Sequence, residues 1–135
     1  MRFVLDASVT LCWCFEDESE LLADKAGKLL VTGSRAVVPA LWWFEIRNAM
    51  TTGLRRKRSP KAKIETFLSD LALLRIDIEG IPDGRRIFAL AERHKLTFYD
   101  AAYLELAARE RMPLATLDQA LARAALQEGV ALVGA

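Results

Sequence analysis

Short apolar segments alternate along this chain with longer segments in which apolar residues recur every three or four positions. The short segments are typical of strands buried in a parallel sheet, and the longer ones of amphipathic helices. We therefore expect strands at residues 2–5, 36–39, 75–78, 113–116 and 130–133. We expect helices that begin at Val9 and Ser19, one from Pro39 towards Arg58, one that starts at Ser59-Pro60, and further helices over 83–94, 97–111 and 119–128.

The regular succession of strand and helix predicts an α/β fold, a three-layer sandwich in which a central, mainly parallel sheet is flanked by helices. In such folds ligands bind outside the carboxyl ends of the strands. At 135 residues, of which 53% are hydrophobic, the chain has the size of one domain. We expect residues 1–135 to form that single domain.

The charge composition of the chain does not indicate a class of binding partner. Nineteen Lys and Arg against eighteen Asp and Glu leave a net charge of +1, which predicts neither a nucleic-acid nor a membrane partner. The longest apolar run, residues 36–44, contains Pro39 and is far shorter than the roughly 20 residues of a membrane-spanning helix. Cys12 and Cys14 are poorly spaced for a disulfide, which fits reduced thiols. We expect a cytoplasmic protein without a secretory signal.

Three aspartates, Asp6, Asp100 and Asp118, each lie just before a predicted helix and just after an apolar segment or loop. In a parallel sheet all three could meet at one edge, and that convergence would indicate a functional site. The alternative is a helix N-cap, for which Asp is a favoured residue, and Thr97 to Asp100 also fits a capping box. Taken singly, each Asp is more readily explained as a cap.

Glu45 is harder to explain as a structural residue. It is the only charged residue within 39–46, and Leu41 and Trp42 precede it on the same helical face. A buried carboxylate without a partner is costly, so the position indicates either a function or a carboxylate that is paired or exposed. Asn48, three residues further on, shares this face.

Four acids of this kind suit a hard cation such as Mg²⁺ or Mn²⁺, which prefers oxygen ligands. Zinc is disfavoured, because Cys12, Cys14 and His94 are the only soft or imidazole ligands and lack the spacing of known zinc sites. RNA cleavage by a pair of histidines is excluded, since the chain has one histidine. Neither a GxSxG elbow nor a complete phosphate-binding P-loop occurs.

Four segments carry a family resemblance. Residues 4–8 read Val-Leu-Asp-Ala-Ser, 45–50 read Glu-Ile-Arg-Asn-Ala-Met, 99–103 read Tyr-Asp-Ala-Ala-Tyr, and 116–118 read Thr-Leu-Asp. Together they resemble the motifs of the PIN-domain nucleases, in that family's order and at comparable distances, over essentially the whole chain. Within the group the chain most resembles VapC toxins, with Met50 where Leu is common.

The resemblance implies a metal-dependent endoribonuclease that acts as the toxin of a VapBC-type toxin–antitoxin system. Asp6, Glu45 and Asp100 would hold one or two Mg²⁺ or Mn²⁺ ions, with Asp118 completing the cluster. The ion would activate a water molecule for in-line attack on an RNA phosphodiester. We expect products with a 5′-phosphate and a 3′-hydroxyl.

Further residues would support these acids. Ser8 and Thr116 would do so through their hydroxyls, and Asn48 would orient Glu45 or contact the substrate. The basic run Arg55-Arg56-Lys57-Arg58 would guide the RNA backbone. The alternative for this run is a solvated helix end whose cations favour the helix dipole.

The same resemblance implies two protein partners. VapC-like proteins act with a VapB-type antitoxin, whose tail lies across a hydrophobic groove and blocks the metal site, and they usually form homodimers. Trp13, Trp42 and Trp43 could line such a groove. Three tryptophans in a small protein are, however, more often part of the core.

Two other functions remain open. An aspartyl phosphatase uses Asp at the end of the first strand as nucleophile, as Asp6 would allow, but its pattern has a second Asp where Ser8 stands. A catalytically silent RNA-binding or interaction module could use the same fold, although the intact set of acids argues against it.

Overall fold

The computed structural model describes residues 1–15 and 20–134. Across these residues the chain forms seven helices around a sheet of four strands. The strands are β1 (Arg2–Leu5), β2 (Arg35–Val38), β3 (Ile76–Ile78) and β4 (Leu114–Ala115). The helices are α1 (Ala7–Cys12), α2 (Leu21–Val31), α3 (Ala40–Arg55), α4 (Lys61–Leu71), α5 (Gly84–His94), α6 (Phe98–Glu110) and α7 (Gln119–Gln127).

The strands are all parallel and lie in the order β3-β2-β1-β4. Phe3, Val4 and Leu5 of β1 are fully buried, as expected for a central strand covered on both faces. After β1 the chain continues to β2 and β3 on one side and returns to β4 on the other, so the strand order reverses between β1 and β4. In open parallel sheets, ligands bind outside the carboxyl ends of the strands at such a switch point.

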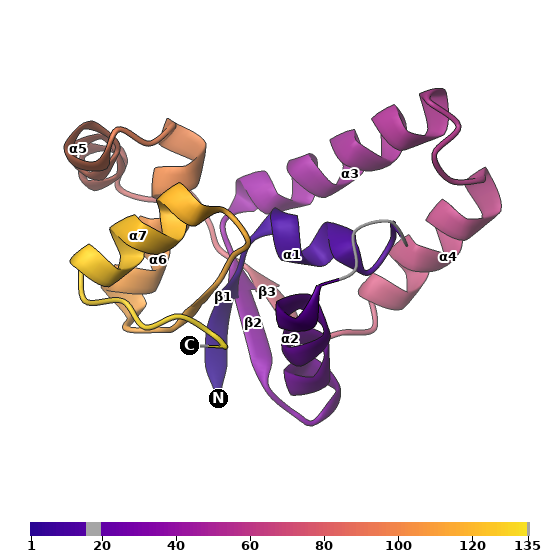
Figure 1. Cartoon of the computed structure of the whole chain (residues 1–135), viewed down its shortest axis with the longest axis horizontal. Coiled ribbons are helices and arrows are strands. Elements are labelled where there is room, and N and C mark those ends of the chain that lie inside the picture. Colours follow the sequence, from indigo (N-terminus) through magenta and orange to yellow (C-terminus); the bar gives the residue numbers. More distant parts are fainter. Residues whose placement is uncertain (16–19, 135) are drawn as a thin grey trace.

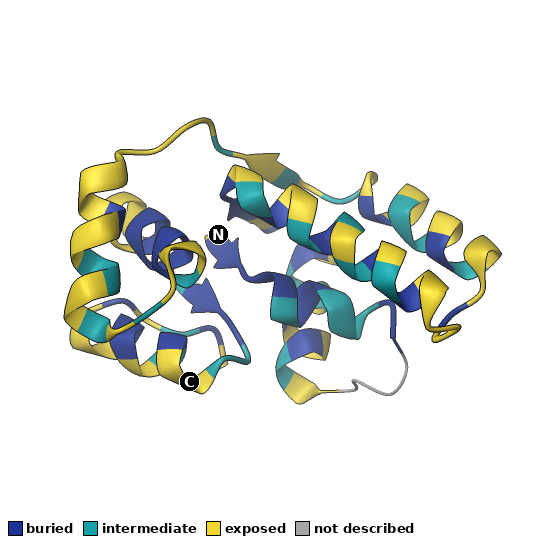
Figure 2. Cartoon of the chain, turned by 90° about the horizontal axis from the view of Figure 1, so that it is seen from above, coloured by how far each residue is buried: buried dark blue, intermediate teal, exposed yellow. Residues whose placement is uncertain are grey.

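Helices cover both faces of the sheet, which confirms the expected sandwich. Figure 1 shows α5, α6 and α7 on one side and α1 to α4 on the other. The buried faces of both layers point inward and the outer faces are exposed (Figure 2). Helix α6 is the most enclosed, with every residue from Ala101 to Ala107 buried between α5, α7 and β1. This helix carries Asp100 and Tyr103 to the edge of the sheet.

Most predicted elements have the expected type, with shifted ends. The first helix begins at Ala7 rather than Val9, since the extended backbone ends at Asp6, which takes the N-cap position without a capping hydrogen bond from its side chain. Gly33 and Gly129 follow the last turns of α2 and α7 with φ of 107° and 75°, a left-handed conformation that glycine adopts without strain. The predicted start of the second helix at Ser19 lies outside the described residues.

The strand predicted at residues 130–133 is wrong. Only Leu132 pairs with the sheet, through an isolated parallel bridge to Leu114. Its partner strand β4 has two residues, which leaves no room for a longer ladder, and a turn follows at Gly134 with a φ of 89°. Val130 and Val133 are apolar because they pack into the core.

No helix within the described residues is both long and apolar enough to cross a membrane.

Candidate functional site

Asp6 lies at the carboxyl end of β1, next to the point where the strand order reverses. Its side chain is 6% exposed and does not cap helix α1. Instead its Oδ2 accepts hydrogen bonds from Ser8 Oγ at 2.8 Å and Thr116 Oγ1 at 2.7 Å. The N-cap alternative is therefore wrong for the Asp6 carboxylate, which is held by the two hydroxyls expected to support it.

The same hydroxyls connect β1 to the loop after β4. Ser8 Oγ accepts a hydrogen bond from the backbone N–H of Leu117 at 3.1 Å, and Thr116 Oγ1 accepts one from Asp118 N–H at 3.0 Å. Because β1 and β4 are neighbours, residues more than 100 positions apart meet here. The arrangement fixes the Asp118 backbone beside Asp6.

Asp118 combines the two roles that the sequence left open. Its Oδ1 accepts a hydrogen bond from Leu121 N–H at 2.8 Å and caps helix α7. Its charge nevertheless acts on Asp6 and Asp100, since it raises the pKa of both carboxyls. Asp118, at the N-cap position of α7, is therefore a fourth acid at the carboxyl-end edge of the sheet.

Asp100 is not the cap of its helix. That role belongs to Thr97, whose Oγ1 accepts a hydrogen bond from the backbone N–H of Asp100 at 3.0 Å. The Asp100 carboxylate lies one turn before Tyr103 on the same face of α6. The first turn of α6 therefore directs Asp100 towards the acids that follow β1 and β4.

Glu45 in helix α3 is joined to the opposite helical layer by one hydrogen bond. Tyr103 of α6 is fully buried, and its hydroxyl donates to Glu45 Oε1 at 2.5 Å. Burial and the neighbouring carboxylates raise the pKa of the Tyr103 phenol, so the hydroxyl keeps its proton and remains a donor. Sequence reasoning gave Tyr103 no role, although a hydroxyl one turn after Asp100 in an apolar helix was a usable signal.

The electrostatics show that the acids share one environment. Burial raises the pKa of Asp6, Glu45 and Asp100 in each case as the largest cause. Repulsion adds to it: Asp6 and Asp100 raise the pKa of Glu45. Hydrogen bonds from Thr116 and Ser8 lower the pKa of Asp6, and the bond from Tyr103 lowers that of Glu45, without cancelling the rise. A bound cation would relieve this repulsion.

The donor set fits Mg²⁺ or Mn²⁺, since all four side chains offer carboxylate oxygens. Within the described residues no three acidic, histidine or cysteine side chains stand close enough to form a ready-made ligand cage. Mg²⁺ does not need one, because it keeps several waters and is usually bound through one or two carboxylates and substrate phosphates. The residues therefore suit a hydrated ion.

The alternative ligands lie elsewhere. His94, the last residue of α5, contacts Glu128 Oε2 at the end of α7 through Nε2 at 2.6 Å. Cys14 is buried against Met50, with 3.6 Å between their sulfur atoms, and forms no disulfide with Cys12. Neither group adds a soft ligand to the acids.

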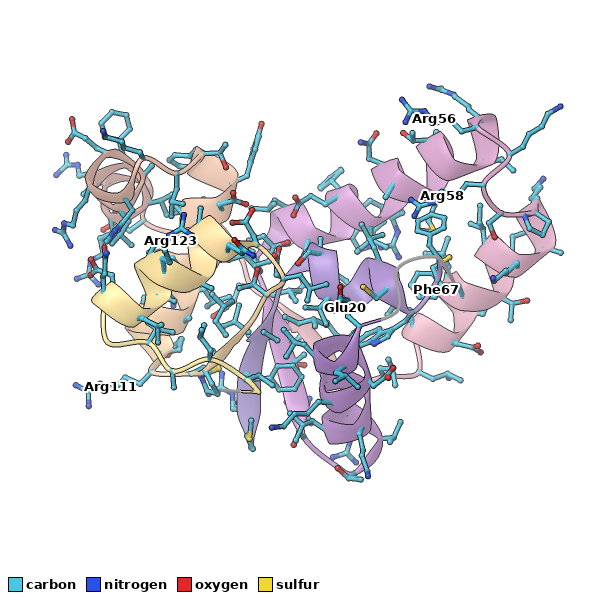
Figure 3. All side chains as sticks on the ribbon, in the orientation of Figure 1. Glu20, Arg56, Arg58, Phe67, Arg111 and Arg123 are labelled. Atoms are coloured by element: carbon cyan, nitrogen blue, oxygen red, sulfur yellow. The ribbon has the colours of Figure 1, made fainter. Side chains whose placement is uncertain are left out.

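Asn48 and the basic run lie at increasing distance from Glu45 along helix α3. Asn48 is exposed one turn on and makes no hydrogen bond to Glu45 in the described part of the chain. Residues 55–58 are all exposed at the far end of the helix, roughly 15 Å from Glu45 along its axis. Figure 3 shows Arg56 there, pointing outward. The structure does not bring this run into contact with the acids.

Metal-free protein is expected to lose stability through these acids as the pH rises from about 4. Because the pKa values of Asp6, Glu45 and Asp100 are raised on folding, the folded state keeps protons that the unfolded chain has released. Their contribution to stability is complete below the unfolded pKa of about 4 and is lost as the pH rises through the raised values.

Glu128 contributes to the pH dependence of stability with the opposite sign. Its contacts with His94 and Arg93 lower its pKa, so its contribution is lost as the pH falls. Urea unfolding of the wild type and Asp6→Asn in EDTA, between pH 4 and 7, separates the contributions. Between pH 4 and 7 the free energy of unfolding should decrease less for Asp6→Asn than for the wild type, because the variant lacks the carboxyl with the raised pKa. The same loss in both proteins would contradict the raised pKa of Asp6.

Tyr103→Phe is expected to reduce metal-dependent activity by about ten-fold and stability by about 1 kcal/mol, because Glu45 loses the hydrogen bond that orients it. Tyr99→Phe is the matched control, since Tyr99 is the only other tyrosine and its side chain is exposed. Steady-state rates and urea unfolding of both variants test this. Equal rates in the two variants would show that the Tyr103 hydroxyl does not position Glu45.

The fold is a parallel α/β sandwich, a class in which ligands bind outside the carboxyl ends of the strands at the switch point, where this chain carries its acids. Residues 3–126 match the family model of the PIN domain, and the chain belongs to this family. PIN domains are generally nucleases and typically use divalent metals, so the family suggests a metal-dependent nuclease.

A solved structure shows the same fold. The crystal structure of PAE2754 from Pyrobaculum aerophilum has a TM-score of 0.67 and 21% sequence identity to this chain, and the match covers 92% of this chain and 84% of that one. It confirms the expected PIN-like sandwich. Among curated proteins, none matches the sequence.

Proposed function

We propose that this protein is a Mg²⁺- or Mn²⁺-dependent endoribonuclease that hydrolyses RNA phosphodiester bonds. The observation that supports the proposal is that Asp6, held by the Ser8 and Thr116 hydroxyls at the end of β1, raises the pKa of both Glu45 and Asp100 by charge repulsion, while Asp118 raises those of Asp6 and Asp100. Perturbed acids gathered at such a point are a candidate active site on physical grounds.

Each residue of the candidate site has its own proposed role. Asp6, Glu45, Asp100 and Asp118 would hold the ion. Ser8 and Thr116 fix the Asp6 carboxylate by donating to its Oδ2. Tyr103 fixes Glu45. When bound, the ion supplies an activated water for in-line attack and neutralises charge on the leaving oxygen. Asn48, exposed one turn beyond Glu45, is proposed to contact substrate.

We further propose that the nuclease is the toxin of a VapBC-type pair, held inactive by a VapB-type antitoxin, and that it forms a homodimer in the cytoplasm. The resemblance of the four acidic motifs to VapC toxins supports this. Trp43 is 41% exposed, which leaves apolar surface for a partner, whereas Trp42 is buried and donates its N–H to Thr10. Coexpression with a VapB-type protein, followed by a pull-down, tests the antitoxin: copurification is expected, and its absence with all VapB-type proteins tried would contradict the pairing.

The activity is tested with a total RNA pool, purified protein and Mg²⁺ or Mn²⁺, against EDTA and against a folded Asp6→Asn, Asp100→Asn double variant. We expect metal-dependent cutting by the wild type alone, with 5′-phosphate and 3′-hydroxyl ends. Equal activity in both proteins would indicate contamination, and products with a cyclic phosphate would contradict the metal-activated water. No cutting by either would favour a silent RNA-binding module.

A further inference from the structure

Two of the acids are each preceded by an exposed aromatic residue. Phe44, next to Glu45 in helix α3, is 67% exposed, and Tyr99, next to Asp100 in helix α6, is 64% exposed. The two helices belong to opposite layers of the sandwich (Figure 1) and are joined at this edge by the Tyr103–Glu45 hydrogen bond. Each ring therefore lies one residue before an acid of the candidate site, on helices from opposite layers.

Helical spacing places the Tyr99 ring on the face of α6 that carries Tyr103, whereas Phe44 lies about 100° around the axis of α3 from Glu45. Tyr99 is four residues before Tyr103, so the two share a face of α6, with Tyr99 about 6 Å nearer its N-terminus. Because the Tyr103 hydroxyl reaches Glu45, this face looks towards the acids. Phe44 shares its face of α3 with Asn48, which in turn lies one turn from Glu45.

The ring of Phe44 is held in place by its neighbour. Trp43 packs edge-on against it, with ring centroids 5.0 Å apart at 74°. Arg47 covers the Trp43 ring at 4.1 Å from its centroid. Phe44 is the outermost member of this stack and remains mostly exposed. The exposed ring offers a flat apolar face on which a bound planar group can stack.

We propose that Phe44 and Tyr99 stack the nucleobases on either side of the phosphate that faces the acids. The inference rests on the proposed function. The acids repel the phosphate backbone, so binding close to them needs a contact that does not depend on charge. Stacking provides it, because every unpaired base offers a flat face to an aromatic ring. The two rings thus position the RNA strand across the four carboxylates.

The test is RNA binding in EDTA, so that cleavage plays no part. A fluorescein-labelled single-stranded RNA and the same backbone with abasic positions are titrated with wild type, Phe44→Leu and Tyr99→Leu, and anisotropy is measured. Leucine keeps the apolar character and suits a helix. We expect each variant to bind the normal RNA about five-fold or more weakly and the abasic RNA as the wild type does.

Two controls keep the result specific. Phe88→Leu removes an equally exposed ring, 65% exposed, from helix α5, and Tyr99→Phe keeps the ring; both should bind like the wild type. Wild-type binding by Phe44→Leu and Tyr99→Leu would overturn the proposal, as would an equal loss on abasic RNA. A change in oligomeric state of Phe44→Leu without a change in RNA binding would assign the ring to a protein interface instead.

The outcome is separable from that of the proposed function. If the wild type cuts RNA and the leucine variants bind normally, the stacking inference fails while the nuclease assignment stands. If the wild type neither binds nor cuts RNA, both fail.

Discussion

Asp6→Asn is expected to lower metal-dependent RNA cleavage by roughly a thousand-fold while leaving the protein folded. Asp6 is the most buried of the four acids at the switch point, and two hydroxyls fix its orientation. Asparagine has nearly the same shape but lacks the charge that would hold the ion. Initial rates at saturating Mn²⁺ measure the loss.

The same substitution is expected to raise the melting temperature of the metal-free protein. Burial raises the pKa of Asp6, so the ionised carboxylate destabilises the folded state at neutral pH, and a neutral amide removes that cost. Asp70→Asn, at an exposed position of α4, is the matched control and should change neither rate nor melting temperature. A lower melting temperature for Asp6→Asn would attribute its lost activity to unfolding.

Reversing two charges of the basic run, as Arg55→Glu with Arg56→Glu, is expected to weaken RNA binding by at least about ten-fold at low salt. The side chains are exposed at the end of α3, and we assume that RNA bound at the acids extends along this helix to them. If both arginines contact phosphates, the slope of log K against log salt should decrease in magnitude by about 1.4 for a single strand.

Lys25→Glu with Lys28→Glu on helix α2 matches this change in net charge, and Lys28 lies in the last turn of its helix as Arg55 does in α3. The control pair should bind RNA more tightly than the α3 pair. Equal binding by the two double variants would support the alternative, a solvated helix end that favours the helix dipole.

Local patterns were sufficient for most of the fold. The apolar run 2–5 ends in a carboxylate, and that pattern alone predicted a buried parallel strand with Asp6 at its carboxyl end. The pattern at 130–133 failed, because two buried valines satisfy core packing as well as a strand does. Local periodicity also carries no information on strand order, so the switch point between β1 and β4 emerged only from the structure.

The candidate site was less accessible to sequence reasoning. The family motifs supplied the four acids and the two hydroxyls, but the Tyr103–Glu45 hydrogen bond joins residues 58 positions apart on different helices. No spacing rule predicts such a contact. Asp118 shows a second limit: capping and function were treated as alternatives, and its carboxylate caps α7 while its charge acts on Asp6 and Asp100.

The most direct test of the central claim, that these acids hold a divalent ion, is anomalous diffraction from crystals soaked in Mn²⁺. We expect an anomalous peak about 2.1 Å from a carboxylate oxygen of Asp6, shared with Glu45, Asp100 or Asp118 directly or through water. The peak should be absent from crystals of Asp6→Asn. Saturating Mn²⁺ without a peak at these residues, or a peak unchanged in Asp6→Asn, would contradict the account.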